Sequence, residues 1–444
     1  MPGKETKTVF RKAALARGVK AYVESHGCTM NYGEGRAAES RLRSGGVEIC
    51  HDPEDADVLL LNTCAVIEFT ENAMLRRLRE LHSLGKRVVV TGCMAPVRKE
   101  SILSAAPGAF VYSPGDHEML DALLGLNIDA DMDCWNSPGR NDVIIPIAQG
   151  CLSRCTYCFS RIARPKLRSV DPERVLGEVR RSLGRGGVRE ILLSGMDAIT
   201  YGRDRGTTLP ALLKDICSIE GEFMVRVGMM NPSLMMPLID ELLDAYGSEK
   251  VYKFFHIPFQ SGSDRILRMM KRGNTAEQFL DIVRRIRRRY PDMTLSTDLI
   301  VGFPGETEDD FRRSLEVIVE TQPDIVNVTR FSAREGTPAA GMTCKIPGWK
   351  AKEWSRRATE LRFRISSEKN GEFAGREMKI LITENGKNGS MIGRTDSYRQ
   401  AVVPGTHAIG ERILCRVVSS TPIHLVCEPL AAHGALGQTL AAVQ

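Results

Sequence analysis

The sequence has no apolar run that approaches the roughly 20 residues a membrane span requires. Residues 1–17 are basic but lack the apolar core of a secretory signal. Neither sign of charge is in large excess, and a net charge of +6 permits a nucleic-acid partner without requiring one. We therefore expect a cytoplasmic protein that makes no contact with a membrane.

The sequence also lacks a Ser/His/Asp pattern that would support a hydrolase, and it lacks the paired CxxC spacings favoured by structural zinc sites. Its twelve cysteines would indicate disulfides in a small secreted chain. In a chain of 444 residues without an export signal they instead favour reduced thiols and metal ligation. The length itself predicts about three domains.

Three cysteines stand at CxxxCxxC spacing, namely Cys151, Cys155 and Cys158. Three thiolates can ligate three irons of a 4Fe-4S cluster and leave the fourth iron open for chemistry. A strand-like segment at 143–147 precedes the motif, and a helix is expected after it. In this setting the motif resembles that of the radical SAM enzymes, whose open iron chelates S-adenosylmethionine. The alternative is three cysteines near a loop by chance.

A second group of cysteines follows the predicted strands of the N-terminal region. This region alternates strands and helices as in an open parallel sheet, with strands at 19–23, 58–61 and 88–90 and helices at 32–43 and 67–84. Cys28, Cys64 and Cys93 each come after one of these strands. Because the carboxyl ends of parallel strands lie along one edge, these cysteines are predicted to converge on a second three-cysteine site.

The remainder of the chain divides into further predicted units of an α/β protein. Six strand and helix repeats follow, with strands near 143–147, 190–194, 224–228, 253–259, 293–301 and 325–331. Six repeats are fewer than the eight of a closed TIM barrel, so we expect an open, partial (βα)6 barrel with its site at the C-terminal ends of the strands. Five short strands then predict a small β-barrel. The predicted units are 18–125 (open parallel α/β domain), 142–348 (partial barrel), 349–370 (helix), 371–430 (β-barrel) and 431–444 (tail), with a Gly- and Pro-rich linker over 125–141.

The predicted strand ends also supply candidates for contact with S-adenosylmethionine, and these are Tyr157, Gly195, Met196, Gln260, Ser261 and Gly302. Glycine allows the backbone to approach a ligand closely, although an ordinary turn after a strand would also use it. Tyr157 could lie against the adenine or simply pack in the barrel mouth. The arginine-rich segment 284–289 is expected to form a solvated helix face, with RNA contact as the alternative.

Taken together, the two cysteine groups, the barrel and the C-terminal β-region resemble the radical SAM methylthiotransferases over nearly the whole chain. The resemblance extends to the strings at 25–28, 62–64, 92–93, 150–158, 258–263 and 300–307. It implies two 4Fe-4S clusters, a radical-generating one on Cys151, Cys155 and Cys158 and an auxiliary, sulfur-supplying one on Cys28, Cys64 and Cys93. It also implies a low-potential electron donor of the ferredoxin or flavodoxin type and a sulfur donor. We expect a monomer.

The C-terminal region resembles a TRAM domain, an RNA-binding barrel, in which Arg394, Tyr398 and Arg399 would contact RNA. A β-turn with incidental charge is the alternative. The segment around the CxxxCxxC motif resembles the branch that adds a methylthio group to N6-threonylcarbamoyladenosine at position 37, in the tRNA anticodon loop. The alternatives are isopentenyladenosine-37 tRNA, an aspartate of a ribosomal protein, and an RNA-binding protein with structural iron-sulfur centres.

Overall fold

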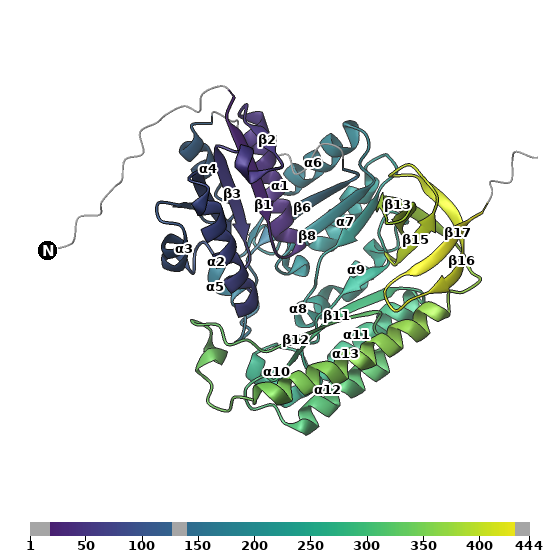
Figure 1. Ribbon diagram of the computed structural model, residues 1–444. Coiled ribbons are helices and arrows are strands. Elements are labelled where there is room, and N and C mark those ends of the chain that lie inside the picture. The colour runs from purple at the N-terminus through teal and green to yellow at the C-terminus, as the bar shows by residue number, and fades with distance from the viewer. Residues whose placement is uncertain (1–17, 127–139, 431–444) are drawn as a thin grey trace, which may run out of the picture.

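The computed structural model describes residues 18–126 and 140–430. Figure 1 shows an N-terminal α/β unit in purple and blue, a partial barrel in teal and green, and a small β-barrel in yellow. The predicted linker lies largely outside the described residues, and the predicted tail lies wholly outside them. Among the described residues, no helix combines the length and the apolarity needed to cross a bilayer.

The N-terminal unit is a five-stranded parallel sheet in the order β2-β1-β3-β4-β5. Its elements are β1 (Lys20–Ser25), α1 (Thr29–Ser44), β2 (Glu48–Cys50), η1 (Pro53–Asp55), β3 (Val58–Thr63), α2 (Glu68–Ser83), β4 (Arg87–Gly92), α3 (Lys99–Ala105), β5 (Phe110–Val111) and α4 (His117–Leu124). The central strand β3 is buried along its whole length, as its continuous apolar sequence predicts. The predicted open parallel sheet is confirmed, and it gains two strands too short to show periodicity.

Helices cover both faces of this sheet. Leu42 of α1 and Leu120 of α4 belong to one buried cluster, and Leu78 of α2 and Ile102 of α3 belong to another. With its two faces covered, the sheet leaves only the strand ends available to ligands, and the ends that follow β1, β3 and β4 carry the N-terminal cysteines.

The central unit contains the six predicted parallel strands, which are β6 (Asp142–Gln149), β8 (Glu190–Gly195), β9 (Met224–Val227), β10 (Phe254–His256), β11 (Thr294–Val301) and β12 (Ile325–Arg330). Between them lie α5 (Ser160–Ala163), β7 (Arg168–Ser169), α6 (Pro172–Gly184), η2 (Ala198–Thr200), α7 (Leu209–Ser218), α8 (Pro232–Met235), η3 (Met236–Leu238), α9 (Ile239–Ala245), α10 (Asp264–Met270), α11 (Ala276–Arg289) and α12 (Glu308–Thr321). No pairing between described residues joins β12 back to β6 or β7, so the predicted open barrel is confirmed.

The barrel sheet is interrupted between β9 and β10, whereas β10 pairs with β11. A single bridge between Val225 and Val251 joins this part of the chain to β9. β10 is also shorter than the predicted 253–259, because Pro258 has no N–H to donate to a neighbouring strand. Pairing resumes where Gln260 bridges to Leu299 of β11.

A long helix connects the two barrels. After η4 (Pro338–Gly341), helix α13 (Gly348–Gly371) packs its buried Trp354 on Phe311 of α12, with ring centroids 5.0 Å apart. The chain then forms a closed barrel in the order β13-β14-β15-β17-β16, composed of β13 (Glu377–Asn385), β14 (Ser390–Arg394), β15 (Gln400–Pro404), β16 (Arg412–Ser420) and β17 (Leu425–Pro429). The predicted five-stranded barrel is therefore confirmed.

Candidate functional site

All six predicted ligand cysteines line one cavity of about 490 Å³. The N-terminal sheet contributes Cys28, Cys64 and Cys93 to its wall, and the barrel contributes Cys151, Cys155 and Cys158. The C-terminal strand ends of two separate sheets thus open into the same chamber. Two cysteine triads that are well separated in the sequence share one space.

Tight turns position the N-terminal triad. Gly27 has φ +110°, and a Cβ there would lie 2.9 Å from the Cβ of Cys64, so only glycine fits in the turn where the chain before Cys28 passes Cys64. The Cys93 amide donates a hydrogen bond to the Thr63 carbonyl at 2.9 Å. This bond continues the pairing of β3 with β4 and fixes the two cysteine-bearing turns side by side.

The barrel triad begins at a second glycine turn. Gly150 has φ +76°, and a Cβ there would lie 2.0 Å from the carbonyl oxygen of Lys166, which leaves no room for any side chain. The loop then carries Cys151 at the end of β6 and turns back on itself, where the Cys158 amide donates to the Cys155 carbonyl at 3.3 Å. The CxxxCxxC segment is therefore held close to the strand end that it follows.

Cys64, Cys93 and Cys155 are buried and Cys151 and Cys158 are partly buried, whereas Cys28 is exposed. Burial raises the pKa of Cys93 to about 12 and the pKa of Cys151 to about 11. Such thiols stay neutral at neutral pH and become thiolates when a metal replaces the proton. No disulfide joins any of the described cysteines.

One buried arginine accompanies each triad. Arg272 donates to the Cys155 sulfur at 3.6 Å and to the Pro258 carbonyl at 2.8 Å. Arg164 lies 3.9 Å from the Cys93 sulfur. Cations at these positions stabilise the negative charge of thiolates, so both triads are suited to hold an anionic cluster.

Arg164 also connects the two domains. It follows α5 of the barrel, yet it pairs with Glu34 of α1, through one bond of 2.6 Å and a second, shorter one. It donates a further bond to Asn31 at 3.3 Å. Only 4% of Arg164 and 6% of Glu34 are exposed, so this ion pair is buried at the domain interface.

The residues fit the predicted 4Fe-4S clusters in donor chemistry. Each triad supplies three thiols to the cavity wall, and Gly27 and Gly150 form the tight turns before Cys28 and Cys151. Among the described residues, no three potential ligands converge closely enough to hold a single metal ion. A cluster does not need such convergence, because each of its thiolates bonds a different iron.

Of the predicted ligand contacts, Tyr157, Gly195, Met196 and Gln260 line the cysteine cavity. Ser261 does not, because it is fully buried beside Ser314, with their hydroxyls 3.5 Å apart. The structure therefore gives the first four residues access to a ligand in this cavity. Ser261 could act on such a ligand only through its neighbours.

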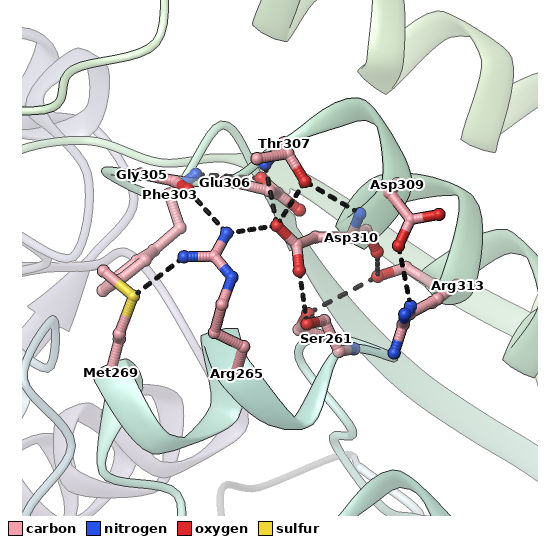
Figure 2. A network of polar contacts seen from close by, with 12 residues as sticks. Ser261, Arg265, Met269, Phe303, Gly305, Glu306, Thr307, Asp309, Asp310 and Arg313 are labelled. Carbon is pink, nitrogen blue, oxygen red and sulfur yellow. Dashed lines mark hydrogen bonds and ion pairs between the residues drawn. The ribbon is translucent and has the colours of Figure 1, made fainter.

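Gly302 also lies away from the cysteine cavity. Its amide donates to Glu306 at 2.6 Å, and a Cβ at this position would lie 2.8 Å from the Cβ of Ala351 in α13. Figure 2 shows Ser261 and Glu306 in the polar network around Asp310 at the start of α12. The glycine therefore has a packing role that the sequence did not reveal.

Sequence reasoning missed several residues of the cavity wall, chiefly Arg272, Arg226 and Asn231. Asp197 lies 3.7 Å from the Cys151 sulfur and accepts a bond from the Asn231 amide at 3.0 Å, and burial raises its pKa to about 6. An arginine inside a buried strand was a usable signal for Arg226. Arg272 has no spacing relation to the cysteines that could have pointed to it.

The three predicted RNA-binding residues have different surroundings. Arg399 is 7% exposed and donates to Asp324 at 2.5 Å and to Asn370 at 2.9 Å, so its guanidinium joins the small barrel to the central one. Tyr398 packs against Tyr252, with ring centroids 4.9 Å apart. Arg394 remains partly exposed. RNA contact by these residues stays a prediction, and the packing favours a domain-joining role for Arg399.

Comparison with protein families gives three matches along the chain. Residues 20–113 match the model described as "Uncharacterized protein family UPF0004", residues 145–318 match the radical SAM superfamily, and residues 372–425 match the TRAM domain. The three matches fall on the three structural units in order.

Several curated proteins are similar over almost their whole length. The "Probable threonylcarbamoyladenosine tRNA methylthiotransferase" of Archaeoglobus fulgidus is 42% identical, over 90% of this chain and 96% of that protein. A protein of the same name from Pyrococcus abyssi is 40% identical, over 93% of this chain and 100% of that protein. The "tRNA-2-methylthio-N(6)-dimethylallyladenosine synthase" of Aquifex aeolicus is 32% identical, over 93% and 98%.

Among solved structures, the radical S-adenosylmethionine methyltransferase TsrM from Kitasatospora setae, with cobalamin and a [4Fe-4S] cluster bound, is similar in fold. Its TM-score is 0.54 at 15% identity, over 72% of this chain and 76% of that one. At this identity the likeness concerns the fold alone.

Proposed function

The chain belongs to the radical SAM methylthiotransferase family, and from this premise we propose that it converts N6-threonylcarbamoyladenosine at position 37 of tRNA to its 2-methylthio derivative. The relatives whose names carry this substrate are 40–42% identical, against 32% for the dimethylallyladenosine synthase of Aquifex aeolicus. The structural observation that carries the proposal is the single cavity lined by two cysteine triads.

Cys151, Cys155 and Cys158 would hold the radical-generating 4Fe-4S cluster, and Cys28, Cys64 and Cys93 would hold the auxiliary one. When bound, the first supplies an electron to S-adenosylmethionine and the second supplies sulfur. Because both triads line the same cavity, the substrate adenine of tRNA position 37 could reach both the radical-generating group and the sulfur-supplying cluster without leaving the cavity.

The protein's own side chains prepare this chamber. Arg272 and Arg164 stabilise the thiolate charge of Cys155 and Cys93. The turn at Gly195 and Met196 offers backbone carbonyls to the ammonium group of S-adenosylmethionine, and Tyr157 and Gln260 complete this wall. These contacts with the cofactor are part of the proposal.

The chamber also favours a base that is already unpaired. A cavity enclosed by two sheets can admit a single extruded adenine, but it cannot admit a duplex. A residue of the anticodon loop meets this condition without melting of a helix. This supports the anticodon loop of tRNA as the partner.

The remaining partners follow from the reaction. Reductive cleavage needs a low-potential electron donor, for which a ferredoxin or flavodoxin type is proposed, and repeated turnover needs a sulfur donor. A tRNA substrate supports a place in the cytoplasm. We propose that the enzyme works as a monomer, since the chain itself contributes both triads to the cavity.

The test is mass spectrometry of tRNA nucleosides after anaerobically reconstituted enzyme has reacted with reductant, S-adenosylmethionine and threonylcarbamoylated tRNA. A methylthio-threonylcarbamoyl nucleoside is expected from the wild type. Cys155→Ala should abolish cleavage of S-adenosylmethionine, whereas Cys64→Ala should retain cleavage and lose methylthio product. Cys50→Ala is the matched control, because Cys50 does not line the cavity.

Other outcomes would assign another function. If product formed only with isopentenyladenosine tRNA or with a ribosomal protein, the reaction would stand and the substrate would change. If the reduced enzyme left S-adenosylmethionine intact, an RNA-binding protein with structural clusters would be favoured. If Cys64→Ala still gave methylthiolated product, the auxiliary role of the N-terminal triad would be wrong.

A further inference from the structure

Helix α13 presents a face to solvent that combines aromatic and basic side chains. Trp349, Lys352, Arg356 and Phe363 recur at intervals of three, four and seven residues, so they share one side of the helix. The opposite side is buried against the barrel through Ala351, Trp354, Ala358 and Ile365. The helix is therefore anchored on one side and available to a partner on the other.

The aromatic side chains on this face are unusually accessible. Trp349 is 69% exposed and Phe363 is 37% exposed. Both line a groove of about 700 Å³, together with Lys352 and with Arg330 at the end of β12. Exposed aromatic side chains that line a groove are candidates for contact with a partner molecule.

The groove is lined by three cations and two carboxylates, so it carries a net charge of +1. The side chains of Lys352 and Arg330 form no ion pair or hydrogen bond with any described residue. The two acidic residues of the groove are engaged by arginines, since Glu360 accepts from Arg356 at 3.1 Å and Glu353 lies 3.7 Å from Arg357. The groove therefore favours an anionic partner.

The arginine-rich face of α11 offers a contrast. There Arg284 pairs with Glu277 and Glu320, and Arg285 pairs with Asp240. Neighbouring carboxylates neutralise much of that charge, as the predicted solvated face requires. Basic composition alone does not distinguish the two helices, but their ion pairs do.

The groove on α13 is one of a series of neighbouring hollows that share lining residues. It shares Phe363 with a cavity of about 370 Å³ between the two barrels, which in turn shares Arg226 and His256 with the cavity of the cysteines. At its other end the groove on α13 shares Arg330 with a hollow of about 580 Å³ beside the exposed Phe69. Figure 1 shows α13 running from the barrel mouth to the small barrel.

We propose that the exposed face of α13, with Arg330, binds the anticodon arm of the substrate tRNA. Trp349 stacks on an unpaired base, and Lys352 and Arg330 contact phosphates. Aromatic rings interspersed with cations along a groove are the groups that bind single-stranded nucleic acid. The identity of the RNA rests on the proposed function, whereas the position of the surface rests on the groove.

The test measures binding of a fluorescent anticodon stem-loop, with threonylcarbamoyladenosine at position 37, to reconstituted enzyme without reductant. Trp349→Ala should weaken binding about tenfold, within the range for loss of one stacked base. Lys352→Glu should weaken binding and reduce the slope of log K against log salt by at least about 0.7. Arg288→Glu makes the same charge change on the outer surface of α11 and should bind within about twofold of wild type. Trp349→Phe should bind nearly as wild type and remove the RNA-dependent quenching of tryptophan fluorescence.

The proposal is wrong if Trp349→Ala and Lys352→Glu both bind the stem-loop as tightly as wild type. If these variants bind RNA normally but a flavodoxin reduces their clusters more slowly, the proposal is also wrong, because the α13 face would then bind a protein electron donor. The mass-spectrometric assay tests the function separately. If wild type makes no methylthio product while both variants lose RNA affinity, the surface stands and the reaction does not.

Discussion

Replacement of Arg399 by glutamine should destabilise the protein by separating the small barrel from the central one. The guanidinium is buried and donates to Asp324 at 2.5 Å and to Asn370 at 2.9 Å. Loss of one partner of a buried ion pair costs about 3–5 kcal/mol. Asp324 would retain Lys369 at 2.7 Å and the Leu295 amide at 2.7 Å, so we expect the lower end, about 3 kcal/mol.

Thermal unfolding is the assay. At roughly 2–4 °C per kcal/mol for a domain of this size, Arg399→Gln should lower the Tm by about 6–12 °C. Arg394→Gln is the matched control at the end of β14, five residues before Arg399, because Arg394 is partly exposed and its ion pair with Glu384 is long, at 3.8 Å. An exposed pair of this kind contributes less than about 1 kcal/mol.

Binding of tRNA at several salt concentrations separates the structural role from a direct contact. If Arg399 joins the barrels, the variant should be less stable and the salt dependence of binding should be preserved in the folded protein. If Arg399 contacts a phosphate, its loss should reduce the slope of log K against log salt by about 0.7–0.9 and leave the Tm unchanged. That second result would refute the domain-joining role.

Three further predictions concern buried charges and the cluster ligands. Burial raises the pKa of Glu306 from 4.5 to about 7, so between these pH values the folded state keeps a proton that the unfolded state releases. The free energy of unfolding should therefore fall by about 3 kcal/mol as the pH rises from 4.5 to 7, and this contribution should stay level above pH 7. Glu306→Gln should be more stable than wild type at pH 8 and equal to it near pH 4, which denaturant titrations at the two pH values will check. Arg164→Met leaves Glu34 buried without its partner and should lower the free energy of unfolding by about 3–5 kcal/mol, as measured by chemical denaturation. The double variant with Glu34→Gln should recover most of this loss. An equal loss in the double variant would contradict the prediction. Cys155→Ala and Cys64→Ala should each lower the iron content of the reconstituted protein by about half, while Cys50→Ala leaves it unchanged.

The sequence was sufficient to predict the cysteine sites because they depend on simple geometry. Parallel strands end at a common edge, so Cys28, Cys64 and Cys93 could be placed together without knowledge of any contact. The CxxxCxxC loop followed a strand that was apolar enough to recognise. The same alternation located all six barrel strands, and it failed only where Pro258 shortens β10.

The sequence was not sufficient to assign the surroundings of single residues on turns. Ser261 and Gly302 stand in strings of the same kind as Gln260 and Gly195, yet only the latter two line the cavity. Which side of a turn faces a ligand depends on packing by distant elements, here α12 and α13. Local spacing carries no information about those neighbours.

The roles of basic residues also could not be assigned from the sequence, but the structure distinguishes them. Arg399 on a loop, Arg284 on α11 and Lys352 on α13 are indistinguishable as basic residues in a sequence. The structure separates them by their partners, because the first is buried on Asp324, the second is paired with glutamates, and the third has no partner among the described residues. Only an unneutralised cation can contribute fully to binding an anion. The RNA footprint of this protein should therefore follow the unpaired cations of α13 and β12 more closely than the regions richest in arginine.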